Sequence, residues 1–202
     1  MQLFNHQELL LRQNPFGGLT DVELEQVLVP HFEMERMLAL IEDRQPKIIE
    51  FLGKKGRGKT SHFRYLHRHL PFYPMYLLDQ NKPSTQIEEL QSPVIFVDSI
   101  FHLGLFRRLR LYRAFETVVL TTHWGRKLEY QFAGKKSYCF HFKGINADRL
   151  KKLIVRRIKV MLANENQEII INDQVVNTLI EKFGDNYRAI LNHLFDQYQR
   201  TK

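Results

Sequence analysis

Two alternating patterns of hydrophobic and polar positions run through residues 27–144. Short, largely apolar runs are typical of strands buried within a sheet, and they occur at residues 48–52, 75–78, 94–97, 117–120 and 137–142. Apolar positions at helical spacing fall between these runs, at residues 32–43, 60–70, 103–115 and 124–132. Because strands and helices alternate, the pattern predicts an α/β core with a five-stranded, mostly parallel sheet covered by helices.

After residue 144 the pattern becomes helical. Residues 148–163 carry apolar side chains on one helical side and basic ones over most of the rest, and residues 172–183 form a second helical segment. A third segment begins at Asp185 or Asn186, since these residue types favour helix N-caps. We therefore expect an N-terminal extension at residues 1–26, the α/β core at 27–144 and a small three-helix lid at 145–202.

The strand at residues 48–52 leads directly into a glycine-rich basic loop. Gly53-x4-Gly58-Lys59-Thr60 has the spacing of a phosphate-binding P-loop. In such a loop glycines let the backbone approach a polyphosphate, the lysine reaches the β/γ-phosphates, and the threonine hydroxyl binds Mg²⁺. A chance match is the alternative, and the flanking strand and helix disfavour it. We expect ATP to bind at Gly53, Lys54, Lys55, Gly56, Arg57, Gly58, Lys59, Thr60 and Ser61.

An aspartate, Asp98, ends the apolar run at residues 94–97. The carboxyl ends of parallel strands meet at one edge of an open α/β sheet, where ligands bind, so we expect Asp98 beside the P-loop. There it would hold Mg²⁺ together with Thr60, as a Walker B aspartate does. Many core strands end in aspartate, so the pattern alone is weak. The P-loop that precedes Asp98 in the chain is what favours a metal-binding role for this residue.

The chain carries a formal net charge of +8 over 202 residues, which favours an anionic partner. The alternative is that a bound nucleotide and a solvated surface balance this charge. If the basic clusters contact nucleic acid, affinity should fall steeply with salt. The candidate contacts are Arg107, Arg108, Arg110, Arg113, Lys135, Lys136, Arg149, Lys151, Lys152, Arg156, Arg157 and Lys159.

The cysteine content and the apolar runs restrict the class of protein further. The single cysteine, Cys139, excludes an internal disulfide. Its place in the alternating run 138–142 predicts a buried strand position and not a nucleophile. No run approaches the roughly 18 apolar residues of a transmembrane helix, so we expect no membrane partner and a cytoplasmic location.

Taken in order, these parts resemble the AAA+ superfamily of P-loop ATPases over residues 27–198. The motif style is closest to replication initiators, clamp loaders and transposon-associated ATPases. By this resemblance residues 53–60 are Walker A and residues 94–98 are Walker B, and residues 29–38 look like the segment that lies along the adenine. The tripeptide at residues 14–16 is similar to one in ATPases linked to transposons and secretion, although a turn with a buried phenylalanine explains it equally.

The resemblance also implies residues that sense the nucleotide. Thr121 or Thr122, at the tip of the next core strand, stands where the sensor-1 residue does. Residues 183–192 look like the lid-helix motif that contains the sensor-2 arginine, which would be Arg188 reaching the γ-phosphate. An ordinary capped helix with a surface arginine is the alternative for that segment.

Two departures from the family concern hydrolysis. Ser99 stands where the catalytic glutamate usually follows the Walker B aspartate, and a serine cannot act as the base that activates water. No arginine matches the finger expected near residues 134–136. Glu50 and Glu116 are candidates for a replacement base only because they are acidic. The resemblance therefore implies binding of ATP and Mg²⁺ with slow hydrolysis.

Three functions fit these residues. The first is a nucleotide-dependent switch or assembly factor that works with copies of itself or a partner protein, with nucleic acid as a candidate target. The second is an active ATPase motor or loader of DNA transactions, in which another acid replaces the missing base. The third is a non-catalytic adaptor with a static nucleotide site. Turnover measured with and without DNA separates the second function from the others.

Overall fold

The computed structural model describes residues 3, 9–79, 87, 90–164 and 167–200. Its contacts divide the chain into two compact units. We call residues 30–55 and 59–142 the sheet unit, and residues 1–29, 56–58 and 143–202 the helical unit. The N-terminal segment, predicted to be a separate extension, thus groups with the C-terminal helices, as does the tip of the P-loop.

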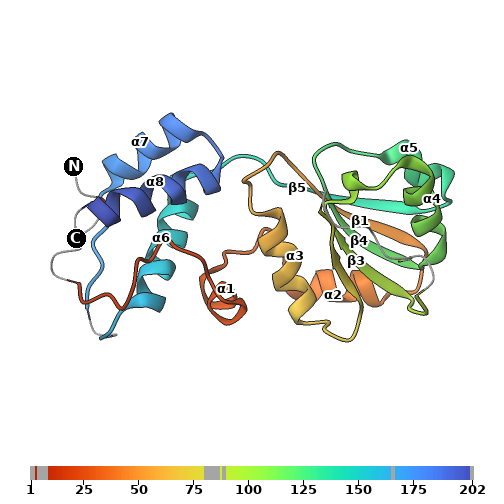
Figure 1. Cartoon of the computed structure of the whole chain (residues 1–202), viewed down its shortest axis with the longest axis horizontal. Helices are drawn as coiled ribbons and strands as arrows, with labels where there is room; N and C mark the ends of the chain where they lie inside the picture. The colour runs from red at the N-terminus through yellow and green to blue at the C-terminus, as the bar shows by residue number, and fades with distance from the viewer. Residues whose placement is uncertain (1–2, 4–8, 80–86, 88–89, 165–166, 201–202) are drawn as a thin grey trace. The chain divides into compact units, whose positions relative to one another are not determined.

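The sheet unit contains five strands in the order β2-β3-β4-β1-β5, and every pairing between neighbours is parallel (Figure 1). In β1, Leu52 pairs with Thr122 of β4 and with His141 of β5, so these three strands end at the same edge. The predicted parallel sheet is confirmed. The strands are β1 (Lys47–Leu52), β2 (Met75–Leu77), β3 (Val94–Asp98), β4 (Thr117–Thr122) and β5 (Lys136–His141).

Helices cover both faces of this sheet. Ile48 of β1 packs in one apolar cluster with Leu111 and Tyr130, whereas the next residue, Ile49, packs in another cluster with Phe63. Successive side chains of a strand point to opposite faces, so α4 and α5 lie on one face and α2 and α3 on the other. These elements are α2 (Met34–Glu42), α3 (Lys59–Arg68), the short 3₁₀ helix η2 (Ile100–His102), α4 (Leu105–Ala114) and α5 (Lys127–Phe132).

The strand β5 forms one edge of the sheet. Its residues are exposed or half-buried, and Cys139 is exposed. The predicted buried position of Cys139 is therefore wrong. The alternating pattern correctly indicated a strand, but an edge strand has a neighbour on one side only and leaves more of its surface to solvent.

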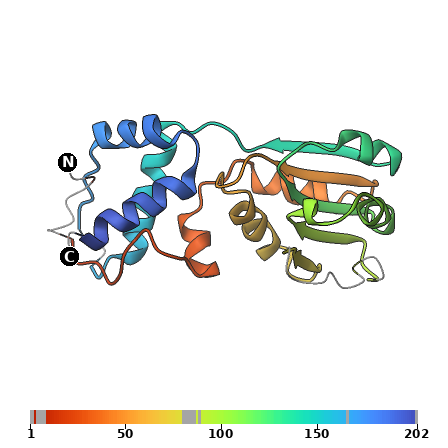
Figure 2. The ribbon, with the colours of Figure 1, turned by 45° about the horizontal axis from the view of Figure 1, so that its top comes forward.

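The helical unit contains the predicted three C-terminal helices, α6 (Ala147–Met161), α7 (Asp173–Phe183) and α8 (Tyr187–Arg200). They share an apolar core that includes Leu150, Ile154, Val176, Ile190 and Leu194. Figure 2 shows them gathered in one bundle, coloured cyan to dark blue. Among the described residues, no helix combines the length and the apolar character that a membrane crossing requires.

The N-terminal segment packs on this bundle. Phe16 is buried in the same apolar core, and the backbone of Leu11 bridges to that of Leu162. The buried guanidinium of Arg157 donates a hydrogen bond from Nε to the carbonyl oxygen of Pro15 at 2.7 Å. The tripeptide at residues 14–16 is therefore a turn that buries its phenylalanine.

A further helix, α1 (Asp21–Val27), follows this turn and was not among the predicted elements. The side chain of Thr20 accepts a hydrogen bond from the backbone N–H of Glu23, and the Glu23 carboxylate accepts one from the backbone N–H of Thr20. This reciprocal arrangement is a capping box, which satisfies two N–H groups that a helix start otherwise leaves unpaired.

Candidate nucleotide site

The loop after β1 requires glycine at two points. A Cβ atom at Gly53 would lie 2.5 Å from the carbonyl oxygen of Phe142. Gly56 has a φ of +86°, and a Cβ there would lie 2.1 Å from Oδ1 of Asn186. The helix α3 begins directly after the loop, at Lys59. The backbone thus enters the helix N-terminus through the compact turn that phosphate-binding loops use.

The side chain of Lys59 is buried and folds back on its own loop. Its Nζ donates hydrogen bonds to the carbonyl oxygens of Gly53 at 2.6 Å and Lys54 at 2.9 Å. A phosphate that binds this ammonium group must therefore compete with two carbonyl oxygens. The neighbouring side chains of Lys54 and Lys55 are exposed, and Ser61 is half-buried.

Side-chain oxygen atoms from the helix α3 and the strands β3 and β4 meet beside Lys59 in the sheet unit. The Thr60 hydroxyl donates to the Asp98 carboxylate, at 3.1 Å from Oδ2 and 3.2 Å from Oδ1. The Thr121 hydroxyl also donates to Oδ1 of Asp98. Thr122 instead bonds the carbonyl oxygen of Trp124 at 3.1 Å. Of the two sensor-1 candidates, only Thr121 contacts Asp98.

This oxygen cluster fits Mg²⁺, which prefers oxygen ligands and commonly takes one or two carboxylates together with substrate phosphates. Thr60 and Asp98, the predicted ligands, lie within hydrogen-bonding distance of each other. In the described part of the chain, no group of three or more histidine, cysteine, aspartate or glutamate side chains converges as a metal site. The candidate Mg²⁺ ligands are therefore the carboxylate of Asp98 and the hydroxyl of Thr60.

Ser99 follows Asp98 with an unusual backbone. Its φ is +61°, and it is the one non-glycine residue with a positive φ among those that the structure describes. Its N–H donates to the Thr121 hydroxyl at 2.8 Å. Left-handed backbone at a residue with a Cβ stores strain that persists only where the surroundings enforce it, as they do at functional sites.

His123 lies beside the loop and is not among the predicted site residues. Its Nδ1 lies 3.0 Å from the carbonyl oxygen of Gly53 and 3.3 Å from Nζ of Lys59. The ring packs at 4.5 Å from the ring of Phe101. Its position in the sequence could have indicated a place in the site, because His123 is the first residue after β4 and so lies at the sheet edge that carries Asp98.

The tip of the loop contacts residues of the helical unit, to which it belongs. Nη2 of Arg57 lies 2.8 Å from Oδ1 and 2.6 Å from Oδ2 of Asp185, and the N–H of Gly144 donates to Oδ2 at 2.9 Å. Arg188 bonds the carbonyl oxygen of Gly56 through its backbone N–H, at 3.2 Å, and is an exposed residue. The sensor-2 role of its guanidinium stays a prediction.

These contacts change the acidity of Asp185. Burial raises the pKa of its carboxyl group, but the hydrogen bonds from Gly144 and Arg57 and the positive charge of Arg57 outweigh burial. The pKa of Asp185 therefore lies below its usual value. The carboxylate stays charged and keeps its hold on the loop at neutral pH.

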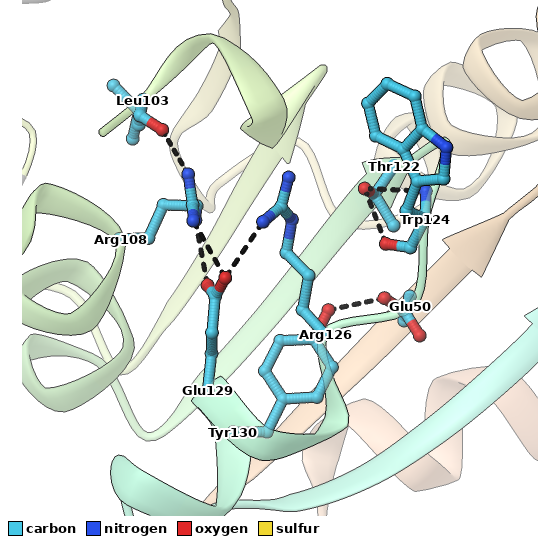
Figure 3. Close-up of polar contacts among 8 residues, drawn as sticks. All are labelled: Glu50, Leu103, Arg108, Thr122, Trp124, Arg126, Glu129 and Tyr130. Atoms are coloured by element: carbon cyan, nitrogen blue, oxygen red, sulfur yellow. Dashed lines mark hydrogen bonds and ion pairs between the residues drawn. The ribbon is translucent and has the colours of Figure 1, made fainter. Parts of the chain in front are cut away.

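The two candidate replacement bases lie away from Asp98. Glu50 is buried within β1, where its carboxylate accepts a hydrogen bond from the Tyr130 hydroxyl (Figure 3). Glu116 directly precedes β4, at the amino end of the strand, whereas Asp98 lies at the carboxyl edge. Neither glutamate is therefore positioned to activate water beside Asp98.

Several of the predicted phosphate-binding cations serve the fold instead. Arg108 is buried and donates to Glu129 at 2.8 and 2.7 Å, and Arg157 is buried against the N-terminal turn. Burial removes both from contact with a nucleic acid, so their assignment was wrong. Further basic residues bond protein groups: Lys135, Arg149 and Arg156 bond backbone carbonyls, and Lys151 bonds Asp173. Exposed candidates remain at Arg110, Arg113, Lys136, Lys152 and Lys159, and also at Arg156, which is exposed although it bonds the carbonyl oxygen of Leu28.

No protein-family model matches the sequence, and no curated protein matches it. Solved structures do match. The replication initiator DnaA bound to AMPPCP and single-stranded DNA is 14% identical, with a TM-score of 0.57 over 85% of this chain and 62% of that one. The Thermotoga maritima RuvB Holliday junction branch migration motor is 16% identical, with a TM-score of 0.56 over 85% and 64%.

A DNA replication initiation factor is 14% identical, with a TM-score of 0.56 over 88% of this chain and 66% of that one. The present chain thus spans less than two thirds of the length of these three solved chains. At such low identity the likeness concerns the fold. It shows that this chain has the fold of the AAA+ P-loop ATPases, which its motifs resemble.

Proposed function

We propose that this chain is a nucleotide-dependent switch or assembly factor that binds ATP with Mg²⁺ and hydrolyses it slowly. The observation that carries the proposal is the grouping of Lys59, Thr60, Asp98 and Thr121 at one edge of the sheet, next to a serine where a catalytic acid is expected. In a P-loop protein the lysine binds the β/γ-phosphates, and Mg²⁺ neutralises the charge of the phosphates.

Each residue has a separate task in this proposal. Lys59 leaves its two loop carbonyls and binds phosphate, while Thr60 and Asp98 hold the metal. Thr121 fixes the orientation of the Asp98 carboxylate through its hydroxyl, and Arg188 reaches the γ-phosphate as sensor 2. The similar fold of DnaA bound to AMPPCP supports a nucleoside triphosphate as the ligand.

Binding is tested by titrating a fluorescent ATP analogue into the wild type and two variants. Lys59→Ala removes the buried ammonium and should abolish binding. Arg44→Ala removes an exposed cation of the sheet unit outside the loop and should leave affinity within a fewfold of wild type, which makes it the control. Unchanged affinity in a folded Lys59→Ala protein would refute the phosphate-binding role of the loop.

Slow hydrolysis follows from the chemistry next to Asp98. A positioned general base contributes about 10²–10⁴-fold to rate, and neither Ser99 nor the two displaced glutamates can supply one there. We expect turnover below roughly 10⁻² per second, against an enzyme median near 10 per second. ATP would then persist on the protein long enough to act as a signal, which suits a switch better than a motor.

The deciding experiment compares ATP turnover of the wild type and Ser99→Glu, with and without DNA. Slow wild-type turnover and a rise of at least about tenfold in Ser99→Glu support the switch. Wild-type turnover of several per second would establish the motor instead. Tight ATP binding without turnover in either protein would favour a static adaptor.

Nucleic acid is proposed as a downstream target, through the exposed cations of α6. Lys152, Arg156 and Lys159 stand at positions i, i+4 and i+7 of this helix and are exposed, which places them on one helical side. If they contact phosphates, binding of a DNA duplex should weaken steeply with salt, and Lys152→Glu with Lys159→Glu should reduce the slope. A salt-independent affinity, or none, would remove nucleic acid from the proposal.

A further inference from the structure

Three large apolar side chains stand in a row on the solvent side of the sheet unit. Trp124, Leu128 and Phe132 are spaced four residues apart, and they are 66%, 70% and 75% exposed. The last two belong to α5, and Trp124 lies just before it. Leu128 and Phe132, four residues apart within α5, therefore share one side of this helix. We call these three side chains the α5 ridge.

The α5 ridge lies next to α4. Nη2 of Arg113, near the end of α4, donates to the carbonyl oxygen of Phe132 at 3.2 Å, and the ring of Phe101, just before α4, lies 6.5 Å from that of Trp124. Phe106 of α4 is exposed as well, at 82%. Exposed apolar side chains gathered in this way mark interaction surfaces, whereas single ones do not.

The charge around the α5 ridge is positive. Arg110 and Arg113 of α4 and Lys127 of α5 are exposed, and α4 contains no acidic residue. The one acid of α5, Glu129, is held between the guanidinium groups of Arg108 and Arg126 (Figure 3). Its negative charge is therefore already compensated within the protein.

The state of Glu129 is consistent with this pairing. Burial raises the pKa of its carboxyl group, but the hydrogen bonds and charges of Arg108 and Arg126 outweigh burial and hold the pKa below its usual value. Glu129 is therefore ionised at neutral pH, and its carboxylate is paired with Arg108 and Arg126. A molecule that approaches the α5 ridge meets apolar side chains bordered by the exposed cations Arg110, Arg113 and Lys127.

We infer that the α5 ridge is a docking site for an acidic amphipathic helix of a partner protein. Leu128 and Phe132 are about 6 Å apart along the axis of α5 at 1.5 Å per residue, and Trp124 adds an exposed ring in the turn before this helix. Such a row packs into the groove along a second helix whose apolar stripe recurs at i, i+3, i+4 and i+7. Glutamate or aspartate beside that stripe would face Arg110, Arg113 and Lys127. These charge pairs would attract the partner helix and also fix its position along the α5 ridge.

Other occupants fit less well. A second copy docking through the same face would bring Arg110 and Arg113 against identical cations, and like charges in contact oppose association. A single-stranded nucleic acid fits the charge but binds through bases stacked on aromatic rings, and the middle residue of the row, Leu128, has no ring. An acidic amphipathic helix can pack its apolar stripe on Leu128 and pair its carboxylates with the surrounding cations.

The chain carries its own reporter of this contact. Trp124 is its single tryptophan, so intrinsic tryptophan emission reports on the α5 ridge alone. The probe is a synthetic amphipathic peptide of roughly four helical turns, with leucine along one stripe and glutamate elsewhere. Titration into the full chain should shift emission to shorter wavelength and saturate, with a Kd on the order of 10 µM. A scrambled peptide of the same composition, which lacks the stripe, should give no shift.

Variants separate the apolar and electrostatic parts. Leu128→Asp should raise the Kd at least about tenfold, while Phe72→Asp, at an exposed apolar residue elsewhere in the sheet unit, should not change it. Arg110→Glu should weaken binding severalfold, and Arg44→Glu, at another exposed arginine, should not. All four positions are exposed, so the fold should survive, which far-ultraviolet circular dichroism and a urea titration verify.

Three results would overturn the inference. One is a peptide affinity that Leu128→Asp leaves unchanged. The second is a Trp124 shift with single-stranded oligo-dT or with anionic phosphatidylglycerol vesicles but not with the amphipathic peptide, which would assign the surface to nucleic acid or to lipid. The third is the lack of any shift with all of these probes. None of these results bears on ATP binding, which Lys59→Ala tests separately.

Discussion

The backbone of Ser99 costs free energy, because left-handed conformation in a residue with a Cβ costs about 1–2 kcal/mol. Replacing it by glycine relieves that strain but adds backbone entropy to the unfolded chain, which offsets about 0.5–1 kcal/mol. We expect Ser99→Gly to stabilise the protein by about 0.5–1 kcal/mol in a urea titration. A loss of stability would mean that the serine side chain makes a contribution larger than the strain.

The pairing of Asp98 with the Thr60 and Thr121 hydroxyls leads to a second residue-scale prediction. Asp98→Asn keeps the shape of the side chain but removes the charge that would hold Mg²⁺. ATP affinity should therefore fall about tenfold or more with Mg²⁺ present and change little when a chelator is present. Equal losses in both conditions would make Asp98 a structural residue that positions Thr60.

At this scale the sequence predicted the residues that local patterns mark and missed those that tertiary contacts define. The P-loop and Asp98 follow from spacing and from the ends of apolar runs. The contact of His123 with Gly53 joins segments far apart in the chain, and no local pattern encodes it. The burial of Arg108 and Arg157 depends in the same way on Glu129 and on the N-terminal turn.

At the scale of elements, apolar runs predicted the five strands and helical periodicity predicted α2 to α8 within a few residues. The helix α5 begins at Lys127 and not at residue 124, because Thr122 and Trp124 bond each other in a turn before it. The helix α1 was missed although Thr20 and Glu23 carry the spacing of a capping box. Its apolar stripe is too short for periodicity to reveal.

The junction of the P-loop tip with α7 and α8 gives a prediction on pH. The folded pKa of Asp185 lies below its unfolded value, so its carboxylate stabilises the helical unit above the unfolded pKa, and that contribution is lost as pH falls through the folded pKa. Asp185→Asn removes this contribution. The stability difference between wild type and variant should thus be constant near neutrality and shrink below about pH 4.

Urea titrations of the wild type and Asp185→Asn from neutral to acid pH measure this stability difference. The protonation of the other carboxylates affects both proteins equally and therefore cancels. Asp173→Asn is a suitable control, since that carboxylate pairs with Lys151 at 2.7 Å on the surface of the same unit. A difference for Asp185→Asn that does not depend on pH would mean that Arg57 and Gly144 are held equally well by a neutral side chain.

At the scale of the whole molecule, the proposed switch requires that nucleotide state changes what the protein assembles with. A site that lacks a base beside Asp98 keeps ATP for long periods, so an ATP-bound assembly would have time to form. We expect light scattering to give a mass above the 24.2 kDa of one chain with ATP, and a lower mass with ADP or without nucleotide. Ser99→Glu provides the kinetic control, because faster hydrolysis should let its ATP assembly decay while the wild-type assembly persists. Equal masses in all three nucleotide states, together with tight ATP binding, would contradict the switch and identify the nucleotide as a static part of the fold.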